Sequence, residues 1–72
     1  MAAVPPLVGE VVSFDVAAGY GSIRALSDGV EHYFHCTALA DGSREVSVGA
    51  RVAFVVVPGA PGRWEAAGVV KL

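Results

Sequence analysis

Apolar and polar residues alternate along much of this chain, and a period of two is typical of β-strands rather than helices. Nine glycines and four prolines interrupt the pattern and leave no helical stretch of ordinary length. Ser27–Gly29 is typical of a tight turn, so the segments on either side of it are expected to form a hairpin. We predict five strands, at about Leu7–Val16, Gly19–Leu26, Val30–His35, Ala50–Val57 and Arg63–Lys71.

Short strands with no helix to cover a flat sheet favour closure into a small barrel, because closure removes the exposed strand edges. Side-chain alternation then predicts which residues point into the barrel. Tyr33 and His35 share the outward face of their strand. The residues expected to point inward are Ile23, Val30, His32, Phe34, Val52, Phe54 and Val56.

The length and composition indicate one folded domain over residues 1–72, with residues 1–6 as an N-terminal lead-in. Hydrophobic residues make up 54% of the chain and charged residues 17%, a balance that excludes an intrinsically disordered protein. The longest apolar run, Val52–Val57, has six residues where a membrane span needs about 20. We therefore expect no association with a membrane.

The chain is expected to be cytoplasmic. Met1–Val8 contains two prolines and no basic residue, so it does not resemble a signal peptide. Cys36 is the single cysteine and cannot form an internal disulfide, whereas small proteins of oxidising compartments usually carry disulfides.

The charge balance argues mildly against tight binding to duplex DNA. Five basic residues stand against seven acidic ones, whereas proteins that neutralise many phosphates are normally basic. Proteins that stack bases on aromatic side chains depend less on net charge. Single-stranded nucleic acid therefore remains a possible ligand.

Two short motifs carry a more specific resemblance. Ala18–Ile23 reads Ala-Gly-Tyr-Gly-Ser-Ile in the second predicted strand, and His32–Cys36 reads His-Tyr-Phe-His-Cys at the end of the third. Their sequence and order resemble the two ribonucleoprotein-type motifs of the cold-shock domain family. The similarity runs from Gly9 to Lys71 and includes Phe14-Asp15 in the first strand.

This resemblance implies a five-stranded antiparallel OB-fold barrel that binds single-stranded RNA or DNA by stacking bases on aromatic side chains. The family positions that carry over as binding residues are Phe14, Tyr20, Tyr33 and His35. Each stacked base contributes about 1–3 kcal/mol, and stacking tolerates most sequences.

Other family positions differ in this chain. Val12 and Ser13 stand where the family has a basic residue and then a tryptophan, and Ala18 replaces a lysine. Ser22 and Cys36 replace aromatic residues. Because each lost stacking contact costs about 1–3 kcal/mol, we expect binding that is weak to moderate and below the strength typical of the family.

Arg63 and Trp64 follow the last predicted loop and offer a possible compensation. Trp64 has a large stacking surface, and Arg63 can hold a phosphate beside it. Two alternatives remain open at this stage. Tyr20 and Tyr33 can pack on each other to stabilise the hairpin, and Trp64 can fold over Pro61 as a lid on the barrel.

No cofactor, metal ion or catalytic activity is expected. His32 and His35 are three residues apart on a strand, so they point to opposite faces and do not easily share a zinc ion. No separate base is apparent that would activate Cys36 as a nucleophile. An enzyme acting on a small molecule would have only the versatility of the fold in its favour.

The leading hypothesis is thus a single-strand binding module. The alternative is a protein-interaction or self-associating barrel that has lost nucleic-acid binding, which the acidic charge and the outward-facing Val55 and Val57 favour.

Overall fold

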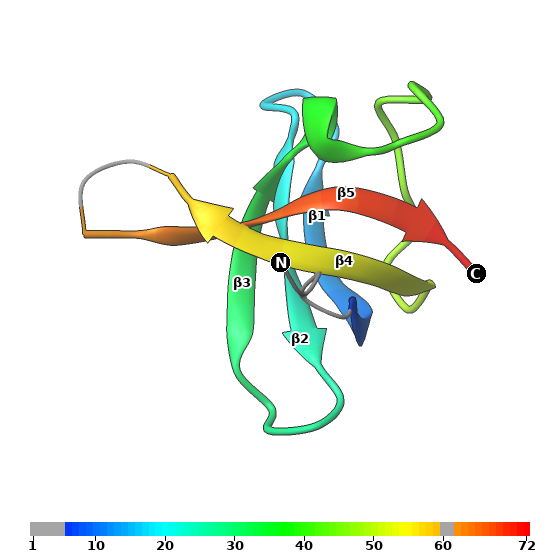
Figure 1. The fold of residues 1–72 in the computed structure, drawn as a ribbon. Helices are drawn as coiled ribbons and strands as arrows, with labels where there is room; N and C mark the ends of the chain where they lie inside the picture. Colours follow the sequence, from blue (N-terminus) through cyan, green and yellow to red (C-terminus); the bar gives the residue numbers. More distant parts are fainter. Residues whose placement is uncertain (1–5, 60–61) are drawn as a thin grey trace.

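The computed structural model describes residues 6–59 and 62–72, so most of the expected N-terminal lead-in lies outside the described residues. The strands are β1 (Leu7–Asp15), β2 (Tyr20–Ala25), β3 (Glu31–His35), β4 (Arg51–Pro58) and β5 (Trp64–Lys71) (Figure 1). Every predicted strand boundary lies within one residue of the observed one. A turn of 3-10 helix, η1 (Cys36–Ala38), follows β3 and was not predicted. No helix in the described part of the chain is long and apolar enough to cross a membrane.

The five strands form a closed barrel with the order β1-β2-β3-β5-β4, and β4 pairs with β1 to close it. The prediction of an all-β, five-stranded OB-type barrel is confirmed. Neighbouring strands are antiparallel except β3 and β5, which run parallel where Tyr33 faces Glu65. β4 and β5 cross in front of β1, β2 and β3 (Figure 1).

The barrel interior is filled by apolar side chains from all five strands. Burial of such side chains contributes about 1.5–3 kcal/mol each and is the main force that closes the barrel. The prediction that Ile23, Val52 and Phe54 form the core is confirmed, and Val56 packs at its edge. The largest fully buried side chains are Phe34, Phe54, Ile23, Val11, Val52 and Val69.

Two residues of the third predicted strand lie differently from Phe34. Val30 is 48% exposed, because it lies just before β3 at the end of the barrel, where its carbonyl accepts from the Ala25 N–H at 2.9 Å. It therefore does not contribute to the core. His32 does lie on the inner side, at the rim of the barrel, where its ring is 5.6 Å from that of Phe54.

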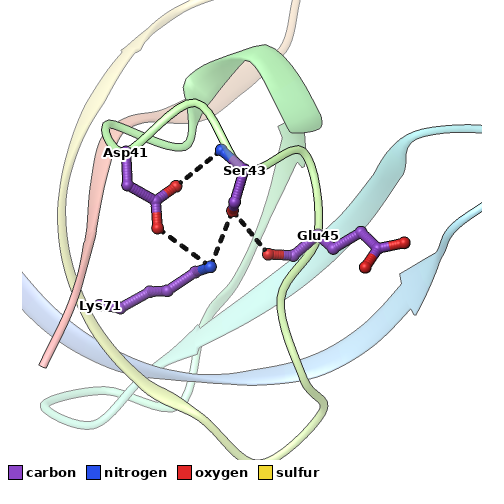
Figure 2. Close-up of polar contacts among 4 residues, drawn as sticks. All are labelled: Asp41, Ser43, Glu45 and Lys71. Atoms are coloured by element: carbon purple, nitrogen blue, oxygen red, sulfur yellow. Dashed lines mark hydrogen bonds and ion pairs between the residues drawn. The ribbon is translucent and has the colours of Figure 1, made fainter.

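The long loop after η1 is held to the end of β5 by a polar cluster (Figure 2). Lys71 forms an ion pair of 3.1 Å with Asp41 and donates a hydrogen bond of 2.8 Å to the Ser43 hydroxyl. The Ser43 backbone N–H donates to the other Asp41 carboxylate oxygen at 2.9 Å. Hydrogen bonds from Ser43 and the nearby Lys71 ammonium lower the pKa of Asp41 to about 2.

This lowered pKa predicts a loss of stability in acid. A carboxyl group whose pKa is depressed in the folded state stabilises the fold above its unfolded-state pKa of 3.8, and the stabilisation disappears as the pH falls towards 2. Asp41→Asn should therefore flatten the dependence of the unfolding free energy on pH between about 4 and 2. Urea unfolding at several pH values measures this slope. The matched control is Asp28→Asn, since Asp28 also accepts a hydrogen bond from the backbone two residues on but lies in the β2–β3 turn. Equal slopes for wild type and Asp41→Asn would contradict the prediction.

Candidate nucleic-acid interface

The strand register arranges the outward side chains of β1, β2 and β3 in rows across the sheet. Residues that face each other across a strand pair project from the same side of the sheet. The row at one end consists of Asp15, Tyr20 and His35. The next row consists of Ser13, Ser22 and Tyr33, and the third of Glu10, Arg24 and Glu31.

Tyr20 and Tyr33 are diagonal neighbours on this surface. Their ring centroids are 5.7 Å apart, and the ring planes are tilted by 39°. Tyr20 is 44% exposed, and Tyr33 is half-buried. The prediction that they share the outward face is confirmed, and the rings also pack across the strands. The two readings left open by the sequence are therefore compatible, because cross-strand packing orients the rings and leaves aromatic surface in contact with solvent.

Two glycines make this placement possible. Gly19 closes the β1–β2 turn with a φ of 76°, a conformation that favours glycine, and its N–H donates to the Asp15 carbonyl at 2.8 Å. Gly21 lies so close to β1 that a side chain there would overlap the Ser13 carbonyl oxygen. The Gly-Tyr-Gly motif thus presents Tyr20 on the outside, between the turn at Gly19 and the close approach of β2 to β1 at Gly21.

Phe14 lies differently from the two tyrosines. Its ring stacks on the buried Phe34, with centroids 5.8 Å apart and an interplanar angle of 18°, and it packs against the core. A bulge between Val11 and Ser13 reverses the alternation of β1, so that Ser13 points outward and Phe14 inward. Phe14 is half-buried and reaches the surface only as part of a shallow depression. Its first role is to pack beneath the outward surface formed by Tyr20, Tyr33 and His35, which we call the platform.

His35 is exposed, and its orientation is set by the start of η1. The Thr37 backbone N–H donates to His35 Nδ1 at 3.3 Å, and the Thr37 hydroxyl lies 3.0 Å from the same nitrogen. With Nδ1 accepting, the proton of the neutral ring is on Nε2, which is left as a donor. Thr37 therefore positions His35. Thr37 was not predicted from the sequence, although His-x-Thr at a strand end is compatible with such a capping contact.

A shallow depression of about 300 Å³ opens between these side chains. The Ser13 and Ser22 hydroxyls, which belong to its lining, form a hydrogen bond of 3.0 Å. The lining of the depression therefore combines aromatic rings with hydroxyl groups. It is lined by Ser13, Phe14, Asp15, Tyr20, Gly21, Ser22 and Tyr33.

Arg63 and Trp64 do not act as a pair in this structure. The guanidinium carbon of Arg63 lies 5.2 Å from the centroid of the Tyr33 ring, a cation–π contact. Trp64 begins β5 opposite Pro58 and is 61% exposed. Adjacent residues at a strand end point to opposite sides, so Trp64 is not directed at Tyr33. Pro61, over which Trp64 was expected to fold as an alternative, lies outside the described residues.

Four charged side chains in the third row and its continuation on β4 alternate in sign. The strand register places Arg51, Glu10, Arg24 and Glu31 side by side across β4, β1, β2 and β3. Each arginine in this charged row has a glutamate as its cross-strand neighbour, which lowers its attraction for a phosphate. Lys71 is engaged by Asp41. Arg63 is thus the cation that the fold brings to the tyrosines, and no group of three potential metal ligands occurs among the described residues.

Comparison with known proteins agrees with this geometry. The model of the 'Cold-shock' DNA-binding domain matches residues 7–72, and the chain therefore belongs to the cold-shock domain family. Among solved structures it is similar to drosophila Unr CSD456, with 27% sequence identity and a TM-score of 0.78. That match covers 93% of this chain and 26% of the other. A search of the curated proteins found no match.

Proposed function

We propose that this cold-shock domain binds single-stranded RNA or DNA in the cytoplasm by stacking bases on the outward face of β2 and β3. The observation that carries the proposal is the contact of Tyr20 with Tyr33, 5.7 Å apart beside the depression. Rings held by a sheet lose little conformational entropy when a ligand binds. The role is binding without catalysis.

The composition of the platform supports a weak to moderate affinity. Ser13 and Ser22 satisfy each other by a hydrogen bond and offer no stacking surface. Two or three missing contacts at about 1–3 kcal/mol each correspond to a loss of affinity of several orders of magnitude. What remains of the stacking surface belongs to the two tyrosines and His35.

His35 and Trp64 have supporting roles in this proposal. His35 faces Tyr20 across the strands, and its free Nε2–H can donate a hydrogen bond to a base or a phosphate. Trp64, exposed at the start of β5, offers a separate stacking point for a nucleotide beyond the platform.

Replacing Tyr33 tests the platform directly. Tyr33→Ala should weaken binding of a labelled single-stranded oligonucleotide by about 5- to 150-fold, the equivalent of one stacked base. Fluorescence anisotropy at low salt measures the affinity, and circular dichroism checks that the barrel remains folded. The converse variant, Val12→Lys with Ser13→Trp, restores the family pattern next to Ser22 and should strengthen binding. Undetectable binding by wild type and by the restored variant, for RNA and DNA alike, would refute the proposed function.

The salt dependence separates stacking from charge. Because the charged row leaves few cations for the nucleic acid, the plot of log affinity against log salt concentration should be shallow. Contacts with about one to three phosphates are expected, each contributing about 0.7 to the slope for a single strand. A slope that corresponds to six or more phosphates would show that charge dominates and that the platform is secondary.

A second candidate function, self-association, is favoured by an apolar surface on the outer face of β4 and β5. Val8, Ala53 and Val70 face one another across three strands, and Val55 faces Ala67 in the adjacent row. Arg51 borders this surface at one end and Glu65 at the other. A two-fold axis through the surface would bring Arg51 of each copy next to Glu65 of the other. We therefore propose that a second copy of this chain covers the surface.

Sedimentation equilibrium tests self-association. The average mass of the wild type should rise with protein concentration, and Val55→Lys should remain monomeric because it places a charge in the middle of the apolar surface. Val48→Lys is the matched control, since Val48 is exposed in the loop before β4. A wild type that remains monomeric at all concentrations would exclude this candidate.

A further inference from the structure

The ring of Tyr33 is already in contact with two neighbours in the free protein. The Arg63 guanidinium lies over the ring at 5.2 Å, and Tyr20 packs on it at 5.7 Å. Part of the surface on which a base would stack is therefore occupied by a side chain of the same molecule. Arg63 itself is exposed, so it can leave the ring without opening the core.

Strand pairing explains why Arg63 lies there. The Gly59 N–H donates to the Arg63 carbonyl at 2.9 Å, which extends the β4–β5 ladder by one step and fixes the Arg63 backbone. Glu65, two residues further on, faces Tyr33 across the parallel β3–β5 pair. Alternation then directs Arg63 to the same side as Glu65 and Tyr33. The Glu65 carboxyl group lies against Gly59, where a side chain would overlap it.

We propose that Arg63 is a displaceable cover on Tyr33, an inference that rests on the function proposed above. In the free protein the guanidinium stacks on the ring. A base replaces it when a single strand binds, and the released guanidinium then pairs with a phosphate of that strand. The same residue would thus oppose stacking and favour the attraction of phosphate.

The strengths of the two contacts make this exchange favourable. An exposed cation–π contact corresponds to a factor of about 2 to 5 in an equilibrium constant, whereas a stacked base corresponds to about 5 to 150. The base therefore displaces the guanidinium at a small cost in affinity. Arginine is suited to both states, because its planar group stacks on aromatic rings and also binds phosphate through two parallel hydrogen bonds.

The two effects of Arg63 respond differently to salt, and this gives the first part of the test. Binding of a single-stranded oligonucleotide is measured for wild type and Arg63→Gln from about 50 mM to 1 M salt. At low salt the wild type should bind more tightly, because it makes one more phosphate contact. At high salt that contact is screened, and Arg63→Gln should bind about 2- to 5-fold more tightly because the ring needs no uncovering. The slope should decrease by about 0.7 in the variant.

The control is Arg51→Gln. Arg51 begins β4, and the segment that carries Arg63 follows the other end of that strand. Affinity lines for wild type and Arg51→Gln should not cross. A variant at Arg63 that binds more weakly than wild type at every salt concentration would overturn the inference and make Arg63 a permanent part of the binding surface.

Nuclear magnetic resonance of the Arg63 side chain gives the second part. In the free protein its δ protons should be shifted upfield by the Tyr33 ring, and Tyr33→Leu or added oligonucleotide should remove the shift. Equal Arg63 shifts in wild type and Tyr33→Leu would show that no cover exists, whether or not the protein binds nucleic acid. If Arg63 lies on the Tyr33 ring but no oligonucleotide changes the resonances of Tyr20 or Tyr33, the proposed function is refuted, and the displacement with it. Binding that leaves Arg63 on the ring would overturn the inference alone.

Discussion

The close approach of β1 to β2 at Gly21 is the constraint on which the rest of the structure depends. The Ser13 carbonyl takes the space that a side chain at Gly21 would need. This lets Phe14 cross above Gly21 and stack on Phe34, which joins the first strand to the core. The same step fixes the register that sets Tyr20 and Ser22 on the outside. Core packing and the candidate binding surface are therefore consequences of one contact between backbones.

Opposite charges lie next to each other on this surface, so they largely cancel and do not create a positive potential. Arg24 and Arg51 flank Glu10 in the charged row, so the outer sheet has little net attraction for a polyanion. Under the proposed function, specific contacts must then supply the affinity. The short range of aromatic stacking fits a domain that engages a few nucleotides without holding long stretches of any nucleic acid.

The sequence predicted the fold to within one residue at each strand boundary, because glycine and proline mark the turns and alternation marks the faces. The same alternation placed Tyr20, Tyr33 and His35 on one outward surface. It did not place Phe14, because a bulge beside Val12 reverses the faces of β1 and leaves no mark in the pattern. The contact of Arg63 with Tyr33 was not predictable either, because it depends on a parallel pairing of β3 with β5 that joins distant segments.

That pairing has a consequence for the dynamics of the domain. β3 and β5 are joined through Tyr33 and Glu65, with a further bridge between Leu39 and Val69, whereas the other strand pairs share four or more partners. A strand pair with so few hydrogen bonds is where a closed barrel opens first in local fluctuations. Tyr33 lies at this junction, so opening would separate it from β5. Under the proposed function, a bound nucleotide that spans Tyr33 and Arg63 would hold β3 and β5 together. Occupancy by a single strand would then slow amide hydrogen exchange on the far side of the barrel as well as beneath the bases.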